Sequence, residues 1–278
     1  SRDACMSGLP DIATLWVGSS LSWLERLTLH SFVQRGHKIT LFHTDPIDSV
    51  DVDGVEMADA RDVFDHTSDF RDAVGAAFLS DLFRLHLAAS TDLIWVDTDA
   101  LCYRPFFAED GYLMAWSPFR GQIPNGVLAL PRNSAAVEIL MGYIDGSAGI
   151  PPWLKNRERK ALKDVPAADR LKEIAQFART SFGPPALTWA LQETGEIERA
   201  LPSSTLYPYP WYLADAAFNP HGGVTDGITD KTISVHLYTS QIRRWNKNRP
   251  VIEGSFIDRF MQEVGFDYGR RRMLAEMD

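Results

Sequence analysis

Short apolar runs alternate with longer segments of helical periodicity along the first hundred residues of the chain. The apolar runs 12–17 and 38–42 have the length and composition of buried strands. Between them, Ser22 and Glu25 have the spacing of a capping box that opens a helix, and Gly36 is a suitable stop. A strand, a helix and a second strand within so short a stretch predict a βαβ unit, and therefore a parallel sheet.

The same alternation continues to residue 96. Residues 55–57 predict a third short strand, which the polar segment 59–72 follows. Residues 73–90 have helical spacing, and they lead directly into the apolar run 93–96, which predicts a buried strand. We therefore expect an α/β fold with a Rossmann-like, mainly parallel sheet flanked by helices.

The second half of the chain is less regular. Residues 112–116 and 126–130 predict two more short strands, and residues 232–237 predict a late one. Residues 153–180 form a basic helical stretch, while residues 200–230 are rich in proline, glycine and aromatic residues and suit a long functional loop. These segments add helices and loops to the expected sheet.

Composition narrows the class of protein. The chain has 278 residues, of which 45% are hydrophobic and 23% charged, as in an ordinary globular enzyme. A net charge of −9 argues against nucleic acid as the main partner. Two cysteines, Cys5 and Cys102, are too few for a disulfide scaffold, and we expect Cys102 to be a buried apolar residue. Since no signal-peptide core and no apolar run of membrane-spanning length occur, we expect a cytoplasmic location.

The chemistry is concentrated in Asp97-Thr98-Asp99, directly after the predicted strand 93–96. Two aspartates one residue apart at a strand end can face the same cation, and hard oxygen ligands suit Mn²⁺ or Mg²⁺. A second Asp-x-Asp, at 51–53, lies in an acidic stretch without an apolar strand before it, and we interpret it as a solvated loop. The 97–99 copy predicts a metal site for a phosphate-bearing substrate.

The commonest other uses of an α/β sheet lack their motifs. Gly18 has no partner glycines for a dinucleotide fingerprint, and the chain has no phosphate-binding P-loop and no Gly-x-Ser-x-Gly elbow. The phosphatase type of Asp-x-Asp has a threonine two residues on, where this chain has Leu101.

A family resemblance rests on the segments 80–84 and 94–99, followed by Arg104-Pro105. Together they resemble the glycosyltransferases whose sugar-binding region contains a DXD motif, family 32 and its α-mannosyl- and α-galactosyltransferases, and more distantly the clostridial glucosylating toxins. Weaker likenesses are spread along the rest of the chain, at Ile12 to Gly18, Asn125 to Val127, Gly183 to Thr188 and His236 to Trp245. The chain departs from the family at 12–16 and at 90–92, where the family usually has Ile-His-Gln-Ile-Trp and a Gly-Gly pair.

This resemblance implies a single GT-A domain over residues 1–278, with a nucleotide-sugar and metal half at 1–110 and an acceptor-side, closing half at 111–278. It implies a metal-dependent retaining transferase that moves a hexose, with a UDP-sugar as the expected donor, to a saccharide or glycolipid acceptor. Two other functions remain open, a metal-dependent nucleotide-sugar hydrolase and a catalytically dead binding module.

Candidate roles follow for individual residues. We expect Asp97, Asp99 and His236 to hold the metal, although a lone histidine is often just a polar core residue. Asp97 and Asp99 are also the expected catalytic residues, and Asp215 and Glu193 are the candidates for an assisting acid. The expected donor-binding residues are Trp16, Val17, Gly18, Asp81, Arg84, Asn125, Gly126, Arg243 and Lys247.

The reasons for these donor-binding roles differ. Asp81 and Arg84 lie three apart on one helix face, where they suit sugar hydroxyls and a diphosphate, or simply form a surface salt bridge. Trp16 can stack on the nucleobase or pack in the core. Arg243 and Lys247, with Arg244, can neutralise the departing diphosphate.

Basic segments suggest one further partner. The stretch 153–172 and Arg270-Arg271-Arg272 reverse the sign of an otherwise acidic chain. They predict peripheral contact with the inner face of a membrane, or are solvated helix faces.

Overall fold

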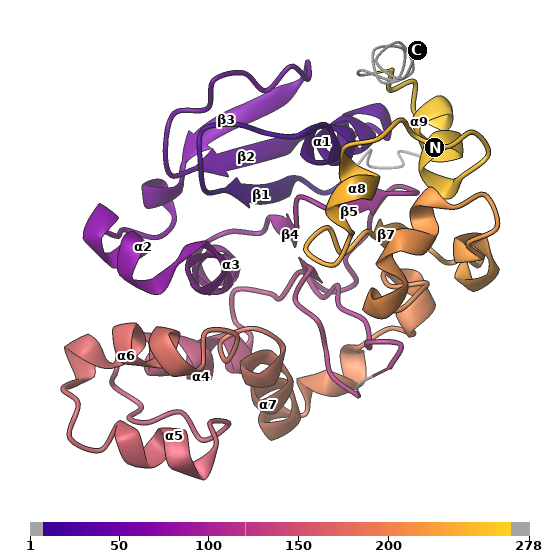
Figure 1. Ribbon diagram of the computed structural model, residues 1–278. Helices are drawn as coiled ribbons and strands as arrows, with labels where there is room; N and C mark the ends of the chain where they lie inside the picture. The colour runs from indigo at the N-terminus through magenta and orange to yellow at the C-terminus, as the bar shows by residue number, and fades with distance from the viewer. Residues whose placement is uncertain (1–7, 120, 268–278) are drawn as a thin grey trace, which may run out of the picture.

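A five-stranded, mainly parallel sheet forms the centre of the structure, a computed structural model that describes residues 8–119 and 121–267 (Figure 1). Its strand order is β3-β2-β1-β4-β6, and only β6 runs antiparallel to its neighbour. The strands are β1 (Ile12–Trp16), β2 (Ile39–His43), β3 (Val55–Asp59), β4 (Ile94–Val96) and β6 (Val127–Leu128). The expected α/β fold with a mainly parallel sheet is confirmed.

Helices cover both faces of this sheet, with α1 and α3 on opposite sides (Figure 1). The α-helices are α1 (Trp23–Gln34), α2 (Ser68–Val74), α3 (Ala76–Ser90), α4 (Ala135–Ile144), α5 (Asn156–Ala161), α6 (Arg170–Phe177), α7 (Pro184–Thr194), α8 (Arg244–Lys247) and α9 (Phe256–Glu263). In β4, Ile94 and Val96 pack in the core that α1 covers, while Trp95 packs in the core that α3 covers. The strand is therefore apolar throughout because both of its faces are buried.

The start of α1 follows the predicted capping box. The Ser22 amide donates to Glu25 at 2.7 Å, and the Leu24 amide donates to the Ser22 hydroxyl at 3.3 Å. These bonds satisfy amide groups that the first helical turn leaves without partners. The helix ends before Gly36, whose φ of +90° favours glycine.

A second, two-stranded sheet brings the end of the chain to the centre. β5 (Ala100–Cys102) follows β4 after a tight turn and pairs antiparallel with β7 (Ser234–His236). In this register Ala100 lies opposite His236. A residue far along the chain is thereby fixed beside the turn at residues 97–99.

Several predicted elements in the second half were wrong. Residues 112–116 do not form a strand; they make only isolated bridges, Tyr112 with Glu109, Leu113 with Ala129 and Ala115 with Leu201. The helical stretch 153–180 is broken into α5 and α6, because Pro166 between them lacks the amide that a continuous helix requires. The sequence pattern also missed α4, which begins at the capping residue Ser134.

Residues 200–230 form no strand in the main sheets and contain short 3-10 helices, as expected for a long irregular segment. The 3-10 helices of the structure are η1 (Ala60–Asp62), η2 (Ala167–Asp169), η3 (Glu196–Arg199), η4 (Ser203–Thr205), η5 (Trp211–Phe218) and η6 (Val224–Gly227). Cys102 is buried, as predicted. Cys5 and the predicted basic cluster 270–272 lie outside the described residues. None of the helices in the described part of the chain is long and apolar enough to span a membrane.

Candidate metal and donor site

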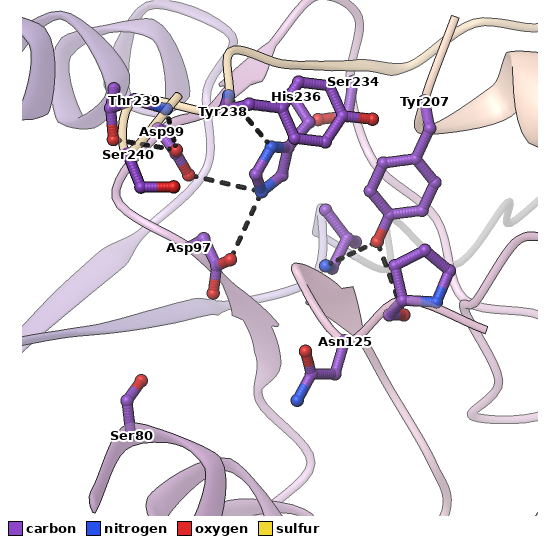
Figure 2. Close-up of polar contacts among 12 residues, drawn as sticks. Ser80, Asp97, Asp99, Asn125, Tyr207, Ser234, His236, Tyr238, Thr239 and Ser240 are labelled. Atoms are coloured by element: carbon purple, nitrogen blue, oxygen red, sulfur yellow. Dashed lines mark hydrogen bonds and ion pairs between the residues drawn. The ribbon is translucent and has the colours of Figure 1, made fainter. Parts of the chain in front are cut away.

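Asp97, Asp99 and His236 meet where β4 turns into β5 (Figure 2). One ligand atom from each of them lies within 4.8 Å of the others. The Nε2 atom of His236 is 3.2 Å from Asp97 Oδ2 and 3.3 Å from Asp99 Oδ1. The three residues predicted as metal ligands are therefore brought together: Asp97 follows β4, Asp99 precedes β5, and His236 ends β7.

Asp97 is held by two donors besides the histidine. Its Oδ1 accepts from the indole of Trp95 at 3.0 Å and from Arg84 Nη1 at 3.1 Å. Arg84 is itself buried and lies over the Trp95 ring. Its other donors bond the Ser80 carbonyl, the Ser80 hydroxyl and the Asn125 carbonyl. With its guanidinium surrounded by protein acceptors, Arg84 orients Asp97.

Asp99 is fixed from the β7 side of the site. Its Oδ2 accepts from both the amide and the hydroxyl of Thr239, at 2.8 and 3.0 Å. Its backbone carbonyl accepts from the Leu237 amide at 2.9 Å. The segment after β7 therefore sets the position of this carboxylate.

The histidine carries its proton toward the two aspartates. His236 Nδ1 accepts from the Tyr238 amide at 3.2 Å, so the neutral ring holds its proton on Nε2. Burial lowers the pKa of His236, but Asp99 and Asp97 outweigh burial and raise the pKa above its ordinary value. Burial likewise raises the pKa of Asp97, yet Arg84, His236 and Trp95 together hold it below the ordinary value. Positive charge is thus favoured between the two carboxylates.

Gly126 leaves the space that this group needs. A Cβ at residue 126 would lie 2.7 Å from His236 Nε2 and 3.2 Å from Asp97 Oδ2. The Gly126 carbonyl accepts from the Asp97 amide at 2.7 Å, which fixes this close approach. Glycine is required at residue 126 because there is no space for a side chain, and not because the backbone adopts an unusual conformation.

A cavity of about 470 Å³ opens beside the carboxylates and has the size of a small-molecule site. Three of the predicted donor-binding residues, Asp81, Arg84 and Asn125, line it together with Asp97 and Asp99, and Gly126 directly follows Asn125. The amide of Asn125 donates to Asp81 Oδ1 at 2.9 Å. Burial raises the pKa of Asp81 to about 6, against the opposing effects of Arg84 and Asn125. The i,i+3 pair of Asp81 and Arg84 is therefore a buried part of the site and not a surface salt bridge.

The three predicted donor residues of the first strand lie at its carboxyl end but do not line this cavity, whereas Leu15 does. Trp16 is half-buried against the core on the α1 side, and its indole nitrogen is buried without a hydrogen-bond partner among the described residues. Val17 packs partly on the opposite core. Gly18 has a φ of +132°, a conformation that favours glycine where the chain turns away from the sheet.

The structure does not bring Asp215, Arg243 and Lys247 into the cavity lining. Asp215 accepts from the Arg243 amide at 3.0 Å and from the Asn246 amide group at 2.5 Å. These contacts tie η5 to the start of α8, so Asp215 supports the segment that follows Thr239. The Arg243 side chain is 71% exposed, and Glu193 is exposed on α7.

Three residues at the site were missed by sequence reasoning. Trp95 binds Asp97 and Thr239 binds Asp99. The Tyr207 hydroxyl accepts from the Val127 amide at 3.1 Å at the start of β6 (Figure 2). Thr239 has a sequence signal, since it lies just beyond the predicted strand 232–237. Trp95 and Tyr207 have none, because apolar packing explains them equally well.

Comparisons with known proteins give weak likenesses. No family model matches the chain, and no curated protein matches it. Among solved structures, the PaToxG glycosyltransferase matches with 14% identity over 69% of this chain and 72% of that chain, at a TM-score of 0.42. The bifunctional glycosyltransferase WbbM, in its apo structure, matches with 9% identity over 99% of this chain and 53% of that chain, at a TM-score of 0.39. Both neighbours are glycosyltransferases, but likenesses at this level leave the function to be inferred from the site.

Proposed function

We propose that the protein is a metal-dependent GT-A glycosyltransferase that moves a hexose from a UDP-sugar to a saccharide or glycolipid acceptor, with retention of anomeric configuration. The observation that carries this proposal is the grouping of Asp97, Asp99 and His236 within 4.8 Å, with both carboxylates lining a cavity. The hexose, the uridine and the retaining course come from the sequence resemblance.

The position of the cavity supports a nucleotide-bearing substrate. Strand order reverses between β1 and β4, since the chain proceeds outward from β1 to β3 and then returns to the other side of β1 with β4. Ligands of open α/β sheets bind at the carboxyl ends of the strands beside such a switch point. Trp16 to Gly18 and Asp97 to Asp99 lie at these two strand ends, which suits a nucleotide between them.

The donor set fits Mn²⁺ or Mg²⁺. Two carboxylates and an imidazole form the group, and the missing Cβ of Gly126 keeps it open. Ligation through His236 Nε2 requires this atom to carry no proton, so the ring would hold its proton on Nδ1 and give up the hydrogen bond from the Tyr238 amide. The doubly protonated ring, which Asp97 and Asp99 favour, would release one proton when the metal binds, so binding should weaken at low pH. When bound, the metal would neutralise charge on the diphosphate as the bond to the sugar breaks.

The remaining roles fall to side chains of the cavity. Asp81 suits a sugar hydroxyl as a hydrogen-bond acceptor, because its buried carboxylate faces the cavity from α3. Arg84 acts as a positioning residue for Asp97. Arg243 and Lys247, on the segment that begins at Thr239, are proposed to meet the departing diphosphate. With retention, the acceptor hydroxyl attacks from the side of the leaving group, whose phosphate takes the proton.

One observation favours hydrolysis as a second candidate. A general base works best with a pKa near the working pH, and burial raises the pKa of Asp81 to about 6. Asp81 could therefore activate water in the cavity beside Asp97. A hydrolase would release free sugar at the same rate with or without an acceptor.

The test is nucleotide release from a panel of UDP- and GDP-sugars with Mn²⁺, in the presence and absence of saccharide acceptors. Asp99→Asn removes one proposed ligand, and Asp92→Asn is the matched control because Asp92 pairs with Arg132 at the protein surface. We expect release from a UDP-sugar that EDTA and Asp99→Asn abolish and that Asp92→Asn leaves intact. Full activity of Asp99→Asn or in EDTA would refute metal dependence, and tighter calorimetric binding of GDP than of UDP would reverse the choice of donor.

A further inference from the structure

A second, smaller cavity of about 140 Å³ adjoins the first one. Aromatic and proline side chains form most of its wall, among them Phe119, Trp211 and Tyr238, with Ser117 and Gln122 as polar members. Pro184 lines both cavities, and Tyr238 directly precedes Thr239, which lines the first cavity and binds Asp99. A ligand in the small cavity would therefore lie next to the carboxylate site.

We propose that this cavity binds a pyranose ring of a saccharide acceptor. This inference rests on the proposed function, and it narrows the acceptor from a saccharide or glycolipid to a sugar held by aromatic contact. The cavity receives the apolar face of the ring, and the acceptor hydroxyl points across Pro184 toward the site of Asp97 and Asp99.

The chemistry of the wall matches a sugar. A pyranose has an apolar face of C–H groups and an edge of hydroxyls, and it needs flat apolar surface with a few hydrogen-bonding groups. Phe119 and Trp211 supply the surface, while Ser117 and Gln122 supply donors and acceptors. The Tyr238 ring lies 4.6 Å from the His236 ring, and its hydroxyl donates to the Tyr209 carbonyl, which fixes one wall (Figure 2).

The aromatic surface continues outside the cavity. The rings of Phe119 and Tyr212 meet edge to face at 5.3 Å, and these side chains are 66% and 51% exposed. Apolar surface of aromatic rings that stays exposed to water is unfavourable, and a ligand that covers the rings removes this surface from water. They provide space for a further ring of an acceptor longer than a monosaccharide.

Two other occupants fit less well. A nucleobase is expected near the end of β1, because the proposed nucleotide lies between β1 and β4. The small cavity lies on the opposite side of β4, since its lining residues Ser117 to Pro124 precede β6 in the chain. An anionic membrane surface needs cations among its aromatic residues, and the described residues that line this cavity include no lysine or arginine.

The test measures binding of methyl glucopyranoside, methyl galactopyranoside and methyl mannopyranoside by saturation-transfer NMR, with UDP and Mn²⁺ present and absent. Phe119→Ala and Trp211→Ala remove the proposed contact surface. Phe177→Ala, which removes an aromatic side chain of 40% exposure on α6, is the matched control. We expect at least one glycoside to bind, with a dissociation constant that rises about tenfold in each cavity variant and stays unchanged in the control.

Absence of binding by all three glycosides, or unchanged binding in both cavity variants, would overturn the inference. Co-sedimentation with phosphatidylcholine–phosphatidylglycerol vesicles, lost in Phe119→Ala without any glycoside binding, would overturn it in favour of a membrane surface. Failure of the proposed function has a different signature, in which the protein binds no UDP in the presence of Mn²⁺ although the glycosides bind. Because Phe119 is largely exposed, its replacement tests the cavity without threatening the fold.

Discussion

The backbone of Gly126 lies against the imidazole of His236, so closely that a Cβ on residue 126 would stand 2.7 Å from Nε2. The same Cβ would stand 3.2 Å from Asp97 Oδ2. Real Cβ atoms do not approach a ring nitrogen so closely, and the Asp97 amide bond to the Gly126 carbonyl prevents the strand from moving aside. The two residues therefore define how much room a cation has between the carboxylates.

We expect Gly126→Ala to abolish Mn²⁺-dependent nucleotide binding while the protein stays folded. The added methyl group forces His236 or Asp97 out of place, but φ at residue 126 is not in the left-handed region, so the backbone accepts alanine. Calorimetric titration of UDP with Mn²⁺ measures the loss. Gly142→Ala in α4, where the new Cβ meets only Ala148 Cβ at 3.3 Å and Ser147 Oγ at 3.5 Å, is the control and should bind normally. Normal binding by Gly126→Ala would place the cation elsewhere.

Asp81→Asn should stabilise the protein at neutral pH. Burial raises the pKa of Asp81 from 3.8 to about 6, so the folded state binds this proton more tightly than the unfolded state. The stability that this proton provides is complete below pH 3.8 and is lost as the pH rises through 6. The neutral asparagine avoids this loss of unfolding free energy. A pKa shift of about two units limits the loss to about 3 kcal/mol.

Urea unfolding of Asp81→Asn and of the original protein at pH 4 and pH 8 measures this effect. We expect a higher free energy of unfolding for the variant at pH 8 and nearly equal values at pH 4, together with lost activity in the transfer assay. An equal difference at both pH values would mean that the variant acts through packing and not through the buried charge.

His86 should make the protein sensitive to acid. Its ring stacks on Phe64 at 4.2 Å, its Nε2 is buried without a hydrogen-bond partner among the described residues, and burial lowers its pKa from 6.5 to about 4. The neutral ring makes its full contribution to the stability of the folded protein above pH 6.5, and this contribution is lost as the pH falls toward 4.

We therefore expect the original protein to lose about 2 kcal/mol between pH 7 and pH 5 through this residue, a loss that His86→Leu removes. Thermal or urea unfolding at the two pH values gives the difference. Equal losses in both proteins would show that other groups cause the acid sensitivity.

The sequence predicts the sheet and both carboxylates because these depend on local pattern. The run 93–96 is apolar on both faces, and Asp97 and Asp99 follow directly after it, in the turn that leads into β5. His236 was also chosen from its predicted strand, but its distance to the carboxylates follows from the pairing of Ala100 with His236, which no local pattern encodes. From sequence, the grouping of Asp97, Asp99 and His236 was therefore a hypothesis. The pairing of β5 with β7 in the second sheet is what brings the three side chains together.

Failures have similar causes. Residues 112–116 form an apolar run typical of a buried strand, yet Leu113 and Ala115 bridge two different partners, Ala129 and Leu201, so no ladder forms. Asp215 was chosen as an acid by residue type, and its carboxylate is engaged by the start of α8. Gly126 was chosen by resemblance, and the reason for glycine is visible only with His236 in place.

The basic segment on α5 provides the last prediction, a test of membrane contact away from the aromatic cavity. Lys155, Arg157, Arg159 and Lys160 are all exposed, and Figure 1 shows α5 at the far end of the lobe that contains α4, α6 and α7. A basic residue near an anionic surface contributes about 1 kcal/mol to binding. If this face meets a membrane, the protein should sediment with vesicles that contain phosphatidylglycerol more than with phosphatidylcholine vesicles at low salt, and replacement of the four residues by serine should remove the difference. Equal partitioning to both vesicles, unchanged by the substitutions, would identify α5 as a solvated helix and leave the glycosyl-transfer proposal intact, because none of these side chains lines the cavity beside Asp97.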